Sequence, residues 1–138
     1  MYAREFIKPE LSSFTRTKSY TKEELRHTAS GFTVKMIDRA GDCAGGEYSG
    51  GSGKAALMAC SYSASAVPAT LIDEIEQDIK NDRGMRFVRS VSRTPGRRVE
   101  ATDPQGRGVA AWNNGHWLFV TIGNSLADTT ALADGVGY

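Results

Sequence analysis

The sequence predicts an α+β fold: an antiparallel sheet that ends in a four-stranded meander, over about residues 85–122, packed against an amphipathic helix over about residues 68–83. Two observations predict it. Between Val67 and Gly84, apolar residues recur at helical spacing and form one stripe made of Leu71, Ile72, Ile75 and Ile79. Four strand-like runs then follow. Their short connections carry the proline and glycine chemistry of turns, so consecutive strands must pair antiparallel.

The rest of the chain supplies further elements. Residues 1–20 are weakly patterned, and we expect an arm or a short helix followed by a loop, ahead of a single α+β domain over 21–138. The capping-box pattern at residues 21–24 predicts a helix over 22–29. The alternation of residues 32–37 predicts a strand. The remaining expected elements are strands over 42–49, 54–64, 85–93, 97–103, 107–113 and 116–122 and a short helix over 126–134.

The two cysteines fall at positions that a hairpin would bring together. If a loop over 50–53 joins the strands 42–49 and 54–64, counting outward from it places Cys43 opposite Cys60. Opposed residues on neighbouring strands bring their Cβ atoms to roughly 4.5–5.5 Å, which is within a small adjustment of disulfide geometry. We therefore predict a disulfide, with two separate buried thiols as the alternative. The bridge favours an oxidising compartment.

The segment from Gly108 to Ile122 predicts a tight hairpin, because two strand-like runs flank Asn114-Gly115. A two-residue turn there places Trp112 opposite Trp117. One face of the hairpin then carries Trp112, Trp117 and Phe119, and the other carries Leu118, Val120 and Ile122. Both faces are apolar, so both need cover. The aromatic face is expected either to line a small apolar pocket beneath the long helix or to be ordinary core.

Charge favours no single class of partner. The formal net charge of the 138-residue chain is +1, which points to neither nucleic acid nor a membrane surface. Arginines are nevertheless concentrated between residues 83 and 107. Arg86, Arg97 and Arg98 would form an anion-binding patch if the fold brings them together near the first meander turn, because guanidinium groups suit carboxylate and phosphate. The alternative is a solvated sheet face paired with acids of the long helix.

No catalytic set, metal site or cofactor motif stands out. The glycine-rich segment 45–54 fails as a phosphate-binding loop, because Tyr48 occupies the first glycine position and Ala55 follows Lys54. The cysteines have no histidine near them in the sequence, which argues against zinc. His116 lies beside the predicted turn, where we expect a solvated residue rather than a base. We predict no catalytic residue, metal or cofactor, and we count His116 with the tryptophans, Phe119 and the three arginines as candidate ligand contacts.

These observations favour a non-enzymatic binding, sensor or interaction module, bacterial and exported, with an unidentified ligand. The expected partner is a protein, a small apolar ligand or another copy of the chain. Two alternatives stay open: a small hydrolase or transferase with a site assembled from loops, and an anion or nucleic-acid binder that uses residues 83–107. No apolar run approaches the roughly 20 residues that a membrane-spanning helix needs. The chain is either cytoplasmic or one from which an export signal has been removed, and the disulfide favours the second.

Overall fold

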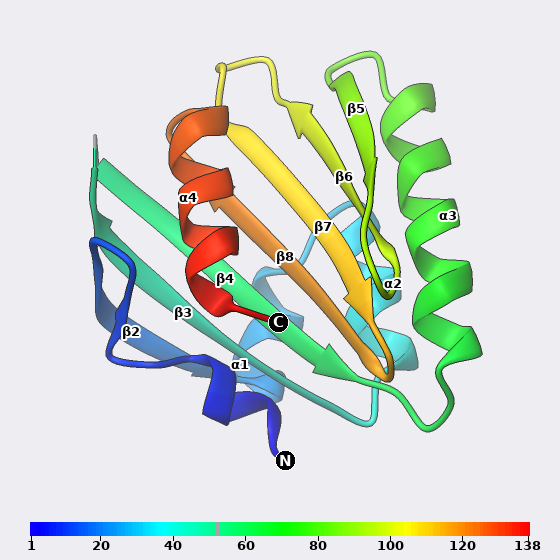
Figure 1. Ribbon diagram of the computed structural model, residues 1–138, viewed down its shortest axis with the longest axis horizontal. Coiled ribbons are helices and arrows are strands. Elements are labelled where there is room, and N and C mark those ends of the chain that lie inside the picture. Colours follow the sequence, from blue (N-terminus) through cyan, green and yellow to red (C-terminus); the bar gives the residue numbers. More distant parts are fainter. Residues whose placement is uncertain (52) are drawn as a thin grey trace.

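The computed structural model describes residues 1–51 and 53–138, and it confirms the α+β class (Figure 1). The strands of these residues form an eight-stranded antiparallel sheet in the order β1-β2-β3-β4-β8-β7-β6-β5. They are β1 Glu10–Leu11, β2 Phe14–Thr21, β3 Asp42–Gly50, β4 Gly53–Ser61, β5 Arg86–Ser92, β6 Arg97–Thr102, β7 Gly108–Asn114 and β8 Trp117–Gly123. The helices are the 3-10 turn η1 Ala3–Phe6, α1 Lys22–Thr28, α2 Phe32–Arg39, α3 Ala66–Asn81 and α4 Leu126–Val136. Of the helices described, none combines the length and apolar character that spanning a bilayer requires.

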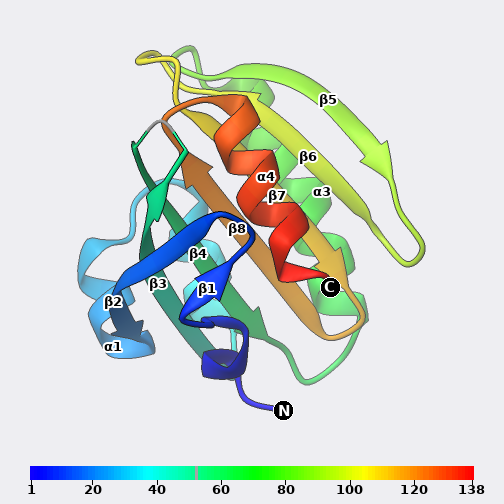
Figure 2. The same ribbon diagram turned by 60° about the vertical axis from the view of Figure 1, so that its left-hand side comes forward.

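Helices cover both faces of the sheet (Figure 1 and Figure 2). On one side, which we call the α3 face, α1, α2 and α3 pack against the strands. On the other, which we call the α4 face, α4 and η1 do so. Each face therefore has its own apolar cluster, and the hairpin β7–β8 contributes side chains to both.

The long helix α3 is confirmed, and so is its apolar stripe. Leu71, Ile72, Ile75 and Ile79 are each no more than 2% exposed. Burying a leucine or isoleucine side chain fully stabilises a fold by about 1.5–3 kcal/mol. This stripe therefore anchors α3 on the strands of the meander, which pair in consecutive antiparallel order as expected.

The hairpin β7–β8 forms, but its turn lies one residue later than predicted. Asn114 pairs with Trp117, and Trp112 lies opposite Phe119 rather than opposite Trp117. The turn residues are Gly115, with φ of +59°, and His116. Gly115 thus takes the positive φ that the first central position of a type II′ turn needs, whereas a type I′ turn would also require it of His116. The pairing shifts by two positions, so every side chain keeps its predicted face.

Residues 32–37 form a helix, α2, so the predicted strand there is wrong. Strand alternation would have placed Phe32, Val34 and Met36 on one buried side, yet Val34 is 40% exposed. Helical spacing instead turns Phe32, Met36 and Ile37 toward the sheet, where Met36 and Ile37 are buried. A short apolar run fits both the two-residue period of a strand and the 3.6-residue period of a helix. The helix is favoured here because it can bury Met36 and Ile37 against the sheet.

The N-terminal segment, expected to be an arm or a short helix, contains the 3-10 helix η1, but the loop expected after it is a strand. Residues 14–21 form β2, which pairs with β3 and with the short β1. Only Phe14 of this strand is buried, so β2 lacks the apolar alternation that marks most strands in a sequence. Its threonines, serine and tyrosine suit a strand near the edge of a sheet.

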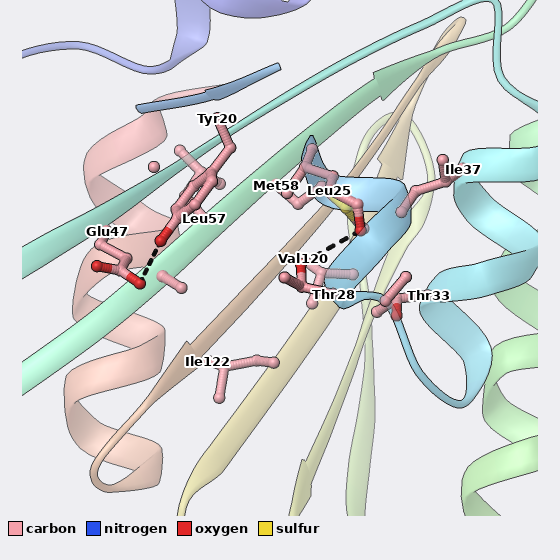
Figure 3. Close-up of a pocket in the computed structure, with 13 residues that line it drawn as sticks. Tyr20, Leu25, Thr28, Thr33, Ile37, Glu47, Leu57, Met58, Val120 and Ile122 are labelled. Atoms are coloured by element: carbon pink, nitrogen blue, oxygen red, sulfur yellow. Dashed lines mark hydrogen bonds between the residues drawn. The ribbon is translucent and has the colours of Figure 1, made fainter. Parts of the chain in front are cut away.

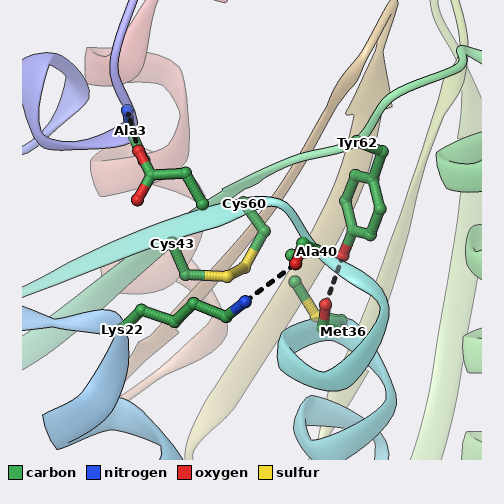
Figure 4. The surroundings of a disulfide bond; sticks show 8 residues. Ala3, Lys22, Met36, Ala40, Cys43, Cys60 and Tyr62 are labelled. Carbon is green, nitrogen blue, oxygen red and sulfur yellow. Dashed lines mark hydrogen bonds between the residues drawn. A yellow bond between two sulfur atoms is a disulfide. The ribbon is translucent and has the colours of Figure 1, made fainter.

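The predicted disulfide joins Cys43 of β3 to Cys60 of β4, with the two Cα atoms 4.2 Å apart (Figure 4). The hairpin register places the two cysteines directly opposite each other, as counted from the sequence. Ser52, which belongs to the loop of this hairpin, lies outside the described residues. Beside the bridge, the Tyr62 hydroxyl donates to the Met36 carbonyl at 2.7 Å and holds α2 against the end of β4. The disulfide belongs to the same apolar cluster as Met36 and Ile37 of α2.

Candidate binding groove

A largely apolar pocket lies on the α3 face, between the short helices α1 and α2 and the strands β3, β4 and β8 (Figure 3). Its volume is about 260 Å³. The residues that line it are Tyr20, Leu25, Thr28, Ala29, Thr33, Ile37, Gly46, Glu47, Ala56, Leu57, Met58, Val120 and Ile122. Leu25 comes from α1 and Ile37 from α2, so two helices form the roof and the sheet forms the floor.

The pocket exists because small residues line this part of the sheet and because the helix that covers it, α1, is short and little buried. Gly45 on β3 has no side chain, and a Cβ added there would lie 2.8 Å from a methyl carbon of Leu25. Leu25 therefore rests directly on the strand. None of the seven residues of α1 is buried, so the helix contributes little bulk. Ala56 on β4 also leaves space, whereas the long helix α3 fills the other half of the same face.

The mouth of the pocket carries a hydrogen-bonded pair of polar side chains. The Tyr20 hydroxyl donates to Oε1 of Glu47 at 2.5 Å. This hydrogen bond, with help from desolvation, raises the pKa of Tyr20 above its ordinary value. Lys18 places its Nζ over the Tyr20 ring, 5.0 Å from the ring centroid. The Thr28 hydroxyl is tied to the Leu25 carbonyl at 3.3 Å.

A second hollow of about 680 Å³ continues from the first and shares Thr28, Thr33 and Ile122 with it. Its walls are the C-terminal end of α3, the start of α2 and the loop between β6 and β7. Its rim is more polar. Asp103 is partly desolvated, but hydrogen bonds from Arg107 outweigh that effect and lower the pKa of Asp103. We call the two hollows together the α3-face groove.

The aromatic residues that the sequence suggested as ligand contacts lie on the opposite face of the sheet from this groove. Trp112, Trp117 and Phe119 are buried on the α4 face, so they do not lie beneath α3. The ring centroids of Trp112 and Phe119 are 5.1 Å apart, and Phe6 of η1 packs 4.7 Å from Trp117. These distances are those of favourable aromatic pairs. The structure thus places the three residues in the packed core that the sequence offered as the alternative to a pocket.

The other predicted contacts are spread over the molecule. Arg97 points toward α3 and pairs with Asp73 at 2.6 Å, while its neighbour Arg98 points toward α4 and pairs with Asp134 at 3.0 Å. Arg86 is exposed at the other end of β5. The fold therefore does not bring the three arginines together. His116 is exposed at the hairpin turn, with Nδ1 3.0 Å from the Tyr62 carbonyl. The described residues include no cluster of His, Cys, Asp or Glu suited to a metal ion.

Sequence reasoning missed most of the groove because its residues come from eight separate helices and strands and from the loops between them. Tyr20 and Leu25 lie in segments with no strong apolar pattern, and Ile37 lies in the helix that was expected to be a strand. One signal was available. Both faces of the hairpin were expected to need cover, and Val120 and Ile122 of one face line the groove.

Comparison with known proteins shows the fold of the chain. No protein-family model matches it, and no curated protein sequence is significantly similar. Among solved structures, a GTP-binding regulator from Thermotoga maritima aligns with a TM-score of 0.53 and 12% identity, covering 92% of this chain and 77% of that one. The extracellular domain of PknH from Mycobacterium tuberculosis aligns with a TM-score of 0.54 and 10% identity, covering 98% and 89%. At such identities the likeness establishes a shared fold and nothing about activity.

Proposed function

We propose that this protein is a binding or sensor module that takes a small apolar ligand into the α3-face groove. The observation that carries the proposal is the pocket of about 260 Å³ beneath α1 and α2, with a floor that includes Met58, Val120 and Ile122. An apolar cavity of roughly 150 Å³ in an engineered protein is enough to bind benzene. The larger pocket here has room for a bigger ring system or a short alkyl chain.

The α4 face is less suited to bind a ligand than the α3-face groove is. Its aromatic side chains already pack against one another and against η1 and α4, so a ligand there would have to displace well-packed core. A ligand in the α3-face groove would instead cover side chains of α1 and β8 that the protein leaves partly exposed, such as Leu25 and Ile122. Burial of such apolar surface contributes about 25 cal/mol per Å², from which the cost of association is subtracted.

We further propose that the protein works outside the cytoplasm. The Cys43–Cys60 disulfide supports this, because such bridges persist mainly in oxidising compartments. One structural neighbour, the PknH domain, is itself extracellular. Mass spectrometry of the protein taken from its native cells, with thiols alkylated at lysis, tests the proposal. An unalkylated, bridged pair is expected, and two alkylated cysteines would contradict it.

Binding of phenylnaphthylamine, a neutral apolar dye that fluoresces when it leaves water, tests the groove. We expect saturable binding to the wild-type chain and a loss of at least about tenfold in affinity for Ala56→Phe, because the added ring fills the pocket. Ala69→Phe, on the exposed side of α3, is the matched control and is expected to bind as the wild type does. If the dye does not bind, or if Ala56→Phe binds it equally well in a folded state, the groove is not a binding site.

A further inference from the structure

We infer that the groove selects a cationic amphiphile, a ligand with an apolar body and a protonated amine at one end. This inference rests on the proposed function and adds the chemical class of the ligand. Two features carry it: the charge of the pocket mouth, and the position of one carboxylate at the edge of the apolar lining.

Glu47 is the charged residue of the pocket. Among the described residues that line the 260 Å³ hollow, no other carries a formal charge. The Tyr20 hydroxyl fixes its Oε1. Within residues 1–51 and 53–138, no side chain pairs with its Oε2. Glu47 is exposed, so its second oxygen can accept a hydrogen bond from an entering ammonium group.

The second hollow strengthens this preference. Three aspartates, Asp78, Asp82 and Asp103, line it together with a single arginine, Arg107. Arg107 is bound to Asp103, so its charge is already matched. Lys35, which lies outside the lining, likewise matches Asp78 at 2.8 Å. Among the lining residues of the two hollows, a carboxylate or phosphate ligand would find four acids and one cation that is already matched. The ammonium group of Lys18 lies outside the lining, over the Tyr20 ring.

Lys18 shows that this corner of the molecule already attracts a cation. It is the register partner of Glu47 on β2, yet its ammonium group lies over the ring of Tyr20. The electron-rich face of a phenol attracts cations, and a carboxylate hydrogen-bonded to its hydroxyl increases that attraction. The polar end of the ligand is therefore expected to lie beside Glu47, and its apolar body to extend toward Val120 and Ile122.

Competition with matched eight-carbon compounds tests the inference. Octylammonium and octanoate below their micelle concentrations, and octanol below its solubility limit, are used at pH 7 to displace phenylnaphthylamine from the full chain. We expect octylammonium to compete at least about threefold better than octanol and octanoate to compete worst, since partly exposed charge pairs change equilibria several-fold. Glu47→Gln keeps an acceptor for Tyr20 but removes the charge, so octylammonium should lose most of its advantage over octanol. Glu10→Gln, an exposed acid on β1, is the control and should keep the preference.

The outcomes separate the two claims. If the dye binds but octanoate or octanol displaces it as well as octylammonium does, the inference is wrong and the groove remains a binding site. The same holds if Glu47→Gln, folded by circular dichroism, keeps the full preference for octylammonium. If the dye does not bind the wild-type chain at all, the proposed function fails, and the inference fails with it.

Discussion

Reduction of the Cys43–Cys60 disulfide gives a sharp test of the architecture. The bridge closes a loop with a sequence separation of 17 and joins two strands that also pair along their whole length. The native sheet should therefore survive reduction, because the ladder between β3 and β4 does not need the bridge. The main effect of reduction is on the unfolded chain, whose conformational entropy increases when the loop is no longer closed.

The size of the effect follows from the loop. Chain-entropy theory gives about 3 kcal/mol for a loop of this length. Unfolding entropies near 2.1 cal/mol/K per residue amount to about 0.3 kcal/mol/K for a chain of 138 residues. The melting temperature should therefore fall by about 10 °C. Because the reduced unfolded chain also exposes more surface, the dependence of unfolding free energy on urea should become steeper.

The assay compares oxidised and reduced protein in matched thermal and urea unfolding. The chain is unfolded with a phosphine reductant, refolded in its presence, and titrated to confirm two free thiols. The double variant Cys43→Ala/Cys60→Ala is a useful companion: it also loses two buried sulfurs, so it should be no more stable than the reduced protein. Reduced protein that has two free thiols but melts within about 2 °C of the oxidised form would refute the assignment of this loop.

Two further predictions concern packing and ionisation. Gly108→Val should destabilise the fold by about 1–3 kcal/mol in urea unfolding, because a Cβ there would lie 2.5 Å from the Cα of Leu126; unchanged stability would contradict this contact with α4. Tyr48 is buried, and burial raises its pKa to about 12. The unfolded phenol ionises near pH 10, so this contribution to stability is complete below pH 10 and is lost as the pH rises through 12. Burial also raises the pKa of Tyr62. Tyr48→Phe should therefore make stability fall less steeply above pH 10, and an unchanged slope would show that Tyr48 ionises normally in the folded state.

The elements that could be predicted are those whose local signals agree with one another. The helix α3 combines an apolar stripe, Pro68 in its first turn and a glycine after its end, and it was placed within two residues. The meander was predicted because each of its connections is short and rich in turn residues. The Cys43–Cys60 pairing followed from one count across a symmetrical hairpin.

The errors arise where tertiary structure decides. For α2, six residues fit two periods, and only the presence of a sheet beneath Met36 and Ile37 favours the helix. For β2, the backbone pairing with β3 holds a strand whose side chains are mostly solvated. The arginines show the same limit, since Arg97 and Arg98 are adjacent in sequence and lie on opposite faces of one strand.

The position of the disulfide links the stability of the fold to the groove. Cys43 and Cys60 fasten β3 to β4, and these two strands supply Glu47, Ala56 and Met58 to the pocket. The floor of the groove is thus held by a covalent bond as well as by the strand ladder. A floor that is fixed before binding lowers the cost of ordering it when a ligand arrives.

The roof of the groove is less firmly held than the floor, because α1 has seven residues and none of them is buried. Helices this short are marginal on their own. Selectivity is therefore expected to come mainly from the shape and charge of the strands, and less from the helix that covers them.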